Sequence, residues 1–363
     1  MKFSHAINRL LQCKDLTTSE STQIMNLIMG GELTPAQVAG FLVALRMKGE
    51  TINEITGMAK SMLKHAVKIK PKAKDIIDTC GTGGDLSNTF NISTVSAIVA
   101  AGAGAVVAKH GNRSVSSNCG SADLLEALGV NITLTPKQVE DCINKVGIGF
   151  LFAPAFHSSM KHAIVPRREL GIRTVFNMLG PLTNPSGASR QLVGVFDEKL
   201  TGVFAQVLRN LGTKRAMIVH ADDGMDEITI SSPTRISEIT SSGRIISYKI
   251  TPEDFKLQAG SKADLICTSV KDSVKTTKMI LTGKAIGSKR NAVLLNAGAA
   301  IYLSGLAKSI AKGVDMALES IESGKAMEKL EELIEFTQTV GEKKATPVAQ
   351  KTVVKKKPAA KKK

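Results

Sequence analysis

Two polar, glycine-rich segments carry the residue types that bind phosphate groups. The first, Asp78–Asp85, reads Asp-Thr-Cys-Gly-Thr-Gly-Gly-Asp and follows the apolar-edged run Asp75–Ile77. The cluster Asn91–Thr94 resembles a helix cap and opens an apolar helical pattern that continues to Ala101. Glycines let backbone N–H groups approach phosphate oxygens, and a helix N-terminus adds partial positive charge. This strand–loop–helix pattern predicts an anion site, although three glycines alone are also typical of an ordinary turn.

The second segment, Lys109–Asp123, strengthens this prediction. It follows the apolar run Ala105–Ala108 and leads into an amphipathic pattern from Leu124. It contains two cations, four serines and two glycines, which is too polar for a plain connection. If both strands are parallel in one sheet, both loops open at the edge where α/β proteins bind ligands. Two such loops in tandem predict a site for a polyanion.

The elements that would position these loops fall into two groups. The first sixty-five residues predict helices only, with starts at Ser19-Glu20 and Thr34-Pro35, and a basic stretch, Lys68–Lys74, follows them. From Asp75 onward, short β-branched runs alternate with helical patterns, which predicts a mostly parallel sheet covered by helices on both faces. Further strands are expected at Ala216–Val219, Leu265–Cys267 and Val293–Leu295.

Composition is that of a globular protein with a large core. The 363 residues are 43% hydrophobic and 22% charged, and this length favours two domains. The five cysteines show no metal-like spacing, so we expect reduced thiols and a cytoplasmic location. Cys80 and Cys119 lie in the two loops, where we interpret them as small neutral fillers rather than nucleophiles.

One uncharged stretch, residues 86–108, is long enough to raise the question of a membrane span. Its first part is Ser, Asn and Thr, and the rest is rich in Gly and Ala. A buried helix followed by a buried strand explains it better, so we expect no membrane span. No signal peptide is recognisable.

The end of the chain is strongly basic. Residues 343–363 contain nine lysines and no acid, and so supply +9 of the net charge of +16. This low-complexity tail has too few apolar groups to offset its ordering entropy, which predicts disorder. Two interpretations stay open: a solvated appendage without a defined partner, or weak, salt-sensitive polyanion binding.

The two loops resemble those of the anthranilate phosphoribosyltransferases, which show Gly-Thr-Gly-Gly-Asp and Lys-His-Gly-Asn-Arg in this order. Two further stretches agree, Arg167–Pro185 and Asp223–Glu227, and the likeness covers roughly residues 1–337. The resemblance implies a small all-helical N-terminal domain and a large α/β domain of the nucleoside phosphorylase and phosphoribosyltransferase type. We expect these at residues 1–68 and 75–337, with a disordered tail at 338–363. The family also implies that residues 161–184 pack back onto the helical domain, and that this domain forms a homodimer.

The implied reaction transfers the phosphoribosyl group of 5-phosphoribosyl 1-diphosphate to the amine of anthranilate, with loss of pyrophosphate. This chemistry needs preorganised charge around the leaving group and an oxocarbenium-like ribose. Lys109 suits a phosphate, whereas Asp85 suits ribose hydroxyls or a metal-bound water. The resemblance places the donor against Gly81, Gly84, Asp85, Thr89, Asn91, Ile92, Ser93, Thr94, Lys109, His110, Gly111, Asn112, Arg113, Ser114, Val115, Ser116, Ser117 and Ser121.

Magnesium is the implied metal, because it takes few carboxylates together with waters and substrate phosphates. The family assigns the carboxylates to Asp226 and Glu227 and a further ligand to the Ser93 hydroxyl. Adjacent residues on a regular strand point to opposite faces, so Asp226 and Glu227 must lie at a strand end or turn. Gly224 fits such a turn.

Arg167 is the implied anthranilate-binding residue, since a guanidinium matches a carboxylate, and Asn112 and Gly81 would line the same pocket. This sequence departs from the family, which usually reads Pro-Val-Arg-Arg, because here Pro166 directly precedes Arg167. Proline changes the local backbone, so Arg168 stays the alternative. We identify no general base, and we expect structural roles for His110 and His157.

Two rival functions are weighed against this one. A pyrimidine nucleoside phosphorylase shares the architecture and a glycine-rich loop, but its pattern lacks the Asp226-Glu227 pair and the Arg167 segment. A non-catalytic, nucleic-acid-binding relative of the same fold would explain the basic tail. The intact loops argue against it.

Overall fold

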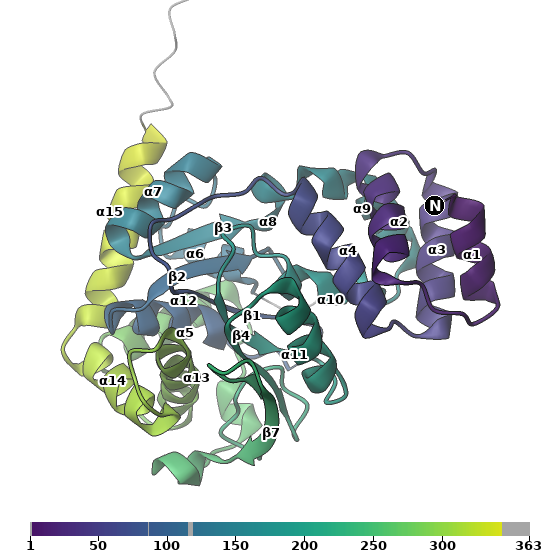
Figure 1. Cartoon of the computed structure of the whole chain (residues 1–363). Helices are drawn as coiled ribbons and strands as arrows, with labels where there is room; N and C mark the ends of the chain where they lie inside the picture. Colours follow the sequence, from purple (N-terminus) through teal and green to yellow (C-terminus); the bar gives the residue numbers. More distant parts are fainter. Residues whose placement is uncertain (1, 86, 115–118, 343–363) are drawn as a thin grey trace, which may run out of the picture.

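The computed structural model describes residues 2–85, 87–114 and 119–342. The chain begins with a helical bundle, which stands to one side of a larger α/β domain (Figure 1). The helices of the bundle are α1 (Phe3–Leu11), α2 (Thr18–Gly30), α3 (Pro35–Lys48) and α4 (Ile52–His65).

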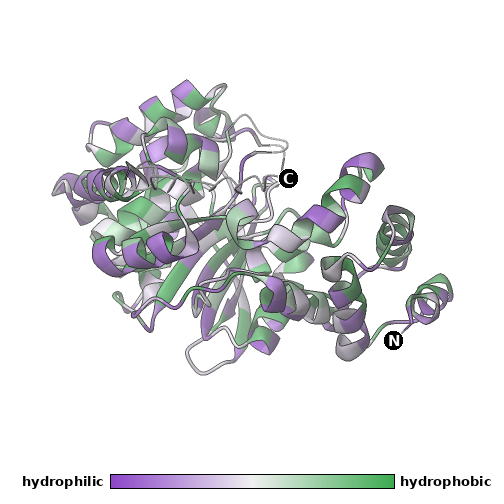
Figure 2. Ribbon diagram, turned by 90° about the horizontal axis from the view of Figure 1, so that it is seen from above, coloured by the Kyte–Doolittle hydropathy of each residue, from purple (hydrophilic) through white to green (hydrophobic). Residues whose placement is uncertain are grey.

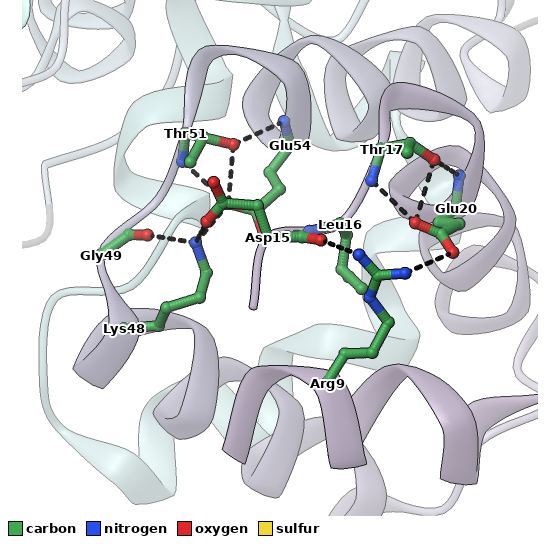
Figure 3. Close-up of polar contacts among 9 residues, drawn as sticks. All are labelled: Arg9, Asp15, Leu16, Thr17, Glu20, Lys48, Gly49, Thr51 and Glu54. Atoms are coloured by element: carbon green, nitrogen blue, oxygen red, sulfur yellow. Dashed lines mark hydrogen bonds and ion pairs between the residues drawn. The ribbon is translucent and has the colours of Figure 1, made fainter. Parts of the chain in front are cut away.

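Threonines set the starts of these helices. The Thr17 hydroxyl accepts the Glu20 N–H while the Glu20 carboxylate accepts the Thr17 N–H, and Thr34 and Thr51 make the same reciprocal capping box. The start of α3 agrees with the sequence prediction, whereas the cap of α2 is Thr17 rather than Ser19. In α4 the boxed acid, Glu54, is fully buried, and it also accepts hydrogen bonds from the Leu16 N–H and the Lys48 ammonium (Figure 3).

A later part of the chain completes the bundle. Residues 153–182 form three short helices and two single turns: α8 (Ala153–Phe156), η1 (Ser158–Met160), α9 (Lys161–Leu170), α10 (Phe176–Leu179) and η2 (Gly180–Leu182). Helix α9 packs on α2 and α3 (Figure 1). Ala163, Val175 and Leu182 share one hydrophobic cluster with Phe41 and Met58. The segment predicted to return to the bundle thus lies against it.

The described part of the α/β domain is built on a seven-stranded sheet in the order β3-β2-β1-β4-β5-β6-β7. Strands β1 to β5 are parallel, and β6 and β7 extend the sheet antiparallel. Their bounds are β1 (Ile76–Gly81), β2 (Val106–Gly111), β3 (Ile148–Phe152), β4 (Arg190–Gly194), β5 (Arg215–Ala221), β6 (Thr234–Ile239) and β7 (Ile245–Ile250). The prediction of a mostly parallel sheet is confirmed.

Both faces of the sheet are covered. Along β5, Met217 and Val219 belong to the cluster under α5 and α13, whereas Ala216 and Ile218 belong to the cluster under α11 and the helical bundle. Figure 2 shows hydrophobic, green segments in the sheet between helices that carry both hydrophobic and hydrophilic residues. The covering elements are α5 (Ile92–Gly102), α6 (Ser121–Ala127), α7 (Pro136–Val146), α11 (Leu200–Leu211), η3 (Pro252–Phe255), η4 (Lys262–Leu265), α12 (Val270–Leu281), α13 (Ser288–Ser304), α14 (Ile310–Glu322) and α15 (Lys325–Glu342).

Two predicted strands are wrong. Residues 293–295 lie inside α13, because a short apolar run looks alike in a buried helix and a buried strand. Residues 265–267 make only an isolated bridge, from Ile266 to Thr89. At the C-terminal end, α15 continues to Glu342, five residues beyond the expected end of the domain. No helix in the described part of the chain is long and apolar enough to cross a membrane.

Candidate active site

The predicted loops open at the same edge of the sheet. Strands β1, β2 and β4 run parallel and end at Gly81, Gly111 and Gly194, so the segments that follow them leave from one side. β5 ends on this side as well, and the Asp226-Glu227 pair lies a few residues after it. This is the edge where parallel α/β sheets place ligands.

The loop after β1 is shaped by glycines and tied to Asp226. Gly83 and Gly84 have φ of +62° and +77°, a region in which only glycine is unstrained. The Gly83 N–H donates to Asp226 Oδ2 at 2.9 Å. The Asp85 carboxylate accepts the Ser87 N–H at 3.3 Å, and Thr89 lies on the isolated bridge to Ile266.

Helix α5 begins at this loop without a side-chain cap. The sequence predicts a cap within the cluster Asn91–Thr94. Asn91 stands at the N-cap position, but its amide donates to the Cys119 carbonyl at 2.5 Å and accepts from the Thr94 hydroxyl at 3.2 Å. Asn91 therefore joins the first loop to the second. Ile92 is 1% exposed and packs in the core, so only its backbone can face a ligand.

Lys109 is buried where the two loops begin. It is 3% exposed, and its ammonium donates to the Thr79 carbonyl at 2.5 Å and to the Ser93 hydroxyl at 3.3 Å. Burial lowers the pKa of Lys109, an effect that the negative charge of Asp78 opposes. The cation is thus held at the junction of β1, β2 and the start of α5.

Asp226 and Glu227 are held close to this cation. Burial, and next the charge of Asp85, raises the pKa of Asp226 to about 7. Burial and then the charge of Asp226 raise the pKa of Glu227, against the charge of Lys109 and a backbone hydrogen bond from Ser93. The adjacent acids therefore converge with Asp85, as the turn at Gly224 (φ +88°) was predicted to allow.

Two strand-end glycines make room for Asp226. A Cβ at Gly194 would lie 1.5 Å from the Asp226 carbonyl oxygen, and a Cβ at Gly81 would lie 2.7 Å from its Oδ2. The first clash is with backbone and cannot be relieved by a rotamer change. The position of Asp226 therefore depends on glycine at both strand ends.

The loop after β2 is organised by carboxylates of α6. The Arg113 guanidinium pairs with Asp123 at 3.0 Å and Glu126 at 2.8 Å, so its charge is already engaged. Asp123 also accepts the backbone N–H groups of Ser114 and Gly120. The predicted donor residues Val115, Ser116 and Ser117 lie outside the described residues.

The two ends of this loop meet at Asn112. Its carbonyl accepts the Ser121 hydroxyl at 3.2 Å, and a Cβ at Gly111 would lie 2.3 Å from that same hydroxyl. Asn112 and Ser121 thus face each other across the loop. The Asn112 side-chain carbonyl accepts the Arg113 N–H.

Asp78 and Asn184 link the two strands that precede the loops, β1 and β2, a role that the sequence interpretation missed. The buried Asp78 carboxylate accepts the His110 N–H at 3.1 Å and the Asn184 amide at 2.8 Å. The same amide donates to the Ala108 carbonyl. Asp78 is the acid that opens the segment Asp78–Asp85, within β1, and this position was the available signal.

His110 and His157 form a buried pair with ring centroids 5.2 Å apart. Among the described residues, the Nε2 atom of neither ring has a hydrogen-bond partner. Burial lowers the pKa of His110 to about 3 and that of His157 to about 4. Both imidazoles are therefore neutral at pH 7.

Arg167 lies in α9, which continues through Pro166 without ending. Its guanidinium lies 5.1 Å from the centroid of the Phe176 ring, and burial lowers its pKa. Arg168, the alternative, is exposed. Only Arg167 has the partly enclosed position expected of a guanidinium that binds a small carboxylate.

Comparisons with known proteins agree with this arrangement. The model of the glycosyl transferase family, a/b domain, matches residues 73–327, and that of the helical bundle domain matches residues 4–66. An anthranilate phosphoribosyltransferase of Acetivibrio thermocellus is 54% identical over 332 residues, which are 92% of this chain and 96% of that protein. This chain belongs to the anthranilate phosphoribosyltransferase family.

Solved structures of family members have the same fold. The enzyme of Thermus thermophilus superposes with a TM-score of 0.87 at 39% identity, covering 92% of this chain and 99% of that one. The Saccharomyces cerevisiae enzyme in complex with PRPP and Mg superposes with a TM-score of 0.86 at 28% identity, covering 93% and 98%. The expected fold class is therefore confirmed.

Most of the residues that the resemblance to anthranilate phosphoribosyltransferases assigns to donor binding lie at one edge of the sheet. Lys109 donates to the Ser93 hydroxyl, and Glu227 interacts with Lys109, Ser93 and Asp226. Arg113 is turned to α6, and the side chains of Ile92 and Thr94 are buried.

Proposed function

We propose that this protein transfers the phosphoribosyl group of 5-phosphoribosyl 1-diphosphate to anthranilate, releasing pyrophosphate, as a step of tryptophan biosynthesis. The observation that carries the proposal is the cluster of Lys109, Asp226 and Glu227 between two phosphate-type loops, in a chain of this family. The family relatives favour neither a nucleoside phosphorylase nor a non-catalytic paralogue.

The donor is assigned to the two loops. The backbone of Gly81–Asp85 and the uncapped start of α5 supply N–H groups for the diphosphate, and Lys109 supplies a fixed positive charge. The remaining donor contacts are assigned to Thr89, His110, Gly111, Asn112, Ser114 and Ser121, together with Val115–Ser117 outside the described residues. Because Lys109 is held in place by Thr79 and Ser93, it costs little reorganisation as charge develops on the leaving group.

The residues present fit magnesium. No ion pair joins Asp226 or Glu227 to a basic side chain in the described part of the chain, and both acids have raised pKa values. Such a concentration of buried carboxylate is stabilised by a cation. Mg²⁺ retains waters and takes substrate phosphates, so it needs few protein ligands. The described residues contain no group of three His, Cys, Asp or Glu side chains that could hold a metal by themselves. We assign Asp226, Glu227 and the Ser93 hydroxyl to Mg²⁺.

When bound, magnesium supplies positive charge to the diphosphate leaving group. The protein's own side chains bind and orient the substrates. Arg167 is assigned to the anthranilate carboxylate, and Gly81 and Asn112 line the same pocket. His110 and His157 are neutral, and the aryl amine is uncharged at neutral pH, so we assign no general base.

The test follows anthranilate fluorescence with donor and Mg²⁺ present, with each omitted in turn. We expect loss of the signal only when both are present. Arg167→Ala should raise the KM for anthranilate about tenfold or more, because it removes a charge-assisted hydrogen bond. Arg168→Ala is the matched control and should leave KM within about twofold. No consumption under any condition would overturn the proposed reaction, and a reversed result would assign Arg168.

We also propose a homodimer formed through the helical bundle. Leu11 of α1 is 69% exposed and Met47 of α3 is 84% exposed, and the two helices pack on each other. The family resemblance implies a dimer through this domain, and these two exposed apolar side chains on packed helices are the residues proposed to lie in it. In sedimentation velocity, Met47→Lys should weaken the dimer, whereas Ile286→Lys, at an equally exposed site of the α/β domain, should not. A monomeric wild-type protein would contradict the proposal.

All five cysteines are free, as expected for a reducing compartment. We therefore propose a cytoplasmic location, which cell fractionation checks. Recovery in a membrane or exported fraction would contradict it.

A further inference from the structure

We propose that Arg173 positions the donor loop, residues 81–85, and couples it to the segment that carries Arg167. The inference rests on the proposed function, because it concerns how the donor site is held in shape. Arg173 itself touches the loop backbone and acts through it.

Arg173 bridges segments that follow two different strands. It lies between α9 and α10, and its Nη2 donates to the Gly84 carbonyl at 2.5 Å. The guanidinium lies over the Phe196 ring, 4.6 Å from its centroid. Gly84 follows β1, and Phe196 follows β4. Because Arg173 is an exposed residue, packing in the core does not explain this contact.

Phe196 is itself attached to the loop. Its N–H donates to the Thr82 hydroxyl at 3.1 Å, and the Thr82 N–H donates to the Gly194 carbonyl at 2.9 Å. Thr82, Phe196, Arg173 and Gly84 thus form a closed set of contacts. The geometry fixes the guanidinium plane by stacking and directs one N–H group at the carbonyl.

A loop of this composition needs such external support. Glycine loses more conformational freedom on ordering than any other residue, and Gly83 and Gly84 have no side chains that could pack. Thr82 is tied to Gly194 and Phe196, and the Gly83 N–H donates to Asp226, a residue assigned to the metal. Arg173 holds the next residue, Gly84, through a contact that does not depend on a metal-binding group.

The same arginine joins the two substrate regions. Arg167 lies in α9, which ends at Leu170 with Gly171 in the left-handed region (φ +62°), and Arg173 follows two residues later. A shift of this helix end would move the Gly84 carbonyl. The donor loop therefore keeps its place relative to the acceptor segment as long as Arg173 is present.

The experiment compares Arg173→Ala and Arg173→Lys with the wild-type protein. We expect Arg173→Ala to raise the KM for 5-phosphoribosyl 1-diphosphate about tenfold, with kcat and the KM for anthranilate within about threefold, because one hydrogen bond to a charged group is lost. Calorimetric titration with the donor and Mg²⁺ should show the same loss of affinity. Arg173→Lys should recover part of it, since an ammonium can donate to the carbonyl but cannot stack as a plane.

Arg209→Ala is the control for charge, since Arg209 is exposed. It lies near the end of α11, towards the edge of the sheet where β5 begins, opposite the edge that carries the loops. It should leave both KM values unchanged. Phe196→Leu tests the contact between Arg173 and the Phe196 ring. It should also raise the KM for the donor, which keeps the inference testable if Arg173→Ala folds poorly.

An unchanged donor affinity in Arg173→Ala and Phe196→Leu would overturn the inference, as would a fall in kcat with no change in KM. These results differ from a failure of the proposed function, in which the wild-type protein itself would neither bind the donor nor consume anthranilate.

Discussion

Gly194 contacts no substrate in the proposed site, yet it is the position that tolerates a side chain least. Its Cβ would overlap the Asp226 backbone, so Gly194→Ala must displace the carboxylate assigned to the metal. We expect turnover to fall at least about a hundredfold and stability to fall by about 1–3 kcal/mol. Steady-state assays of the purified variant measure the loss of turnover, and thermal unfolding measures the loss of stability.

The control is Gly202→Ala in α11, where an added Cβ meets nothing within 4 Å. It should retain full activity with equal or higher stability, because alanine favours a helix. Normal turnover in Gly194→Ala would show that Asp226 does not need its observed position.

The histidine pair gives the protein a predicted sensitivity to acid. Both folded-state pKa values, about 3 for His110 and about 4 for His157, lie below the ordinary value of 6.5. As pH falls below 6.5, the unfolded chain takes up protons that the folded protein does not, so the free energy of unfolding falls until pH reaches the folded-state values. At pH 5 each histidine accounts for up to roughly 2 kcal/mol.

Urea unfolding at several pH values measures this effect. His157→Gln should make the loss of stability between pH 6.5 and 4 shallower, whereas His5→Gln, at an exposed site on α1, should not change it. Equal pH slopes in the wild-type protein and His157→Gln would refute the explanation.

Residue types and order were enough to predict that the two loops lie together, because that prediction needs only local patterns. The loops Asp78–Asp85 and Lys109–Asp123 lie together because parallel strands end at one edge, a consequence of pattern alone. The sequence could not show that the Asn91 side chain reaches Cys119, that Arg113 turns to α6, or that Asp78 binds Asn184. These contacts depend on packing between segments far apart in the chain.

At the scale of elements, one buried carboxylate, Glu54, joins three segments of the helical bundle. Glu54 accepts from the Leu16 and Thr51 N–H groups and from Lys48, whose side chain is 4% exposed. Burial by itself would lower the pKa of Lys48, but the hydrogen bonds that its ammonium donates to Asp15 and Glu54 raise it overall. The ion pair and the cap of α4 are therefore one interaction (Figure 3).

We expect Glu54→Ala to cost about 3 kcal/mol, because it leaves buried donors and part of a buried charge unpaired. Glu20→Ala removes the acid from the same position of the α2 capping box, where it is more exposed, and should cost only about 1 kcal/mol. Chemical unfolding of both variants compares them. Equal losses would show that burial adds nothing to the Glu54 cap.

Element types were predictable where periodicity was long and strong, as in the bundle. The strand predicted at 293–295 failed because an Ala-rich helix buried on nearly all sides has no polar face to reveal its period. The short strands β3 and β4 were missed for the related reason that five residues, four of them buried, carry little pattern.

At the scale of the whole molecule, the basic tail, residues 343–363, follows the last helix of the described site-bearing domain in the sequence. α15 ends at Glu342, and all of the described site lies before residue 228. Removal of residues 343–363 should therefore leave kcat and both KM values within about twofold. If the tail binds polyanions weakly, one of the two interpretations that the sequence leaves open, the truncated protein should elute from heparin at lower salt. Loss of turnover on truncation would show that catalysis needs the tail. Unchanged elution would contradict polyanion binding by the tail.

The bundle is discontinuous in the chain, and this has a consequence during synthesis. Its apolar core joins α1–α4 to residues 163–182, which leave the ribosome about 120 residues after Met62. At roughly 5–20 residues per second, the interval is on the order of ten seconds. During that time the nascent bundle exposes the surface that α9 will cover. We expect chaperones to bind this intermediate during translation, which ribosome-associated crosslinking at staged chain lengths can test. Equal crosslinking before and after residue 182 emerges would contradict this.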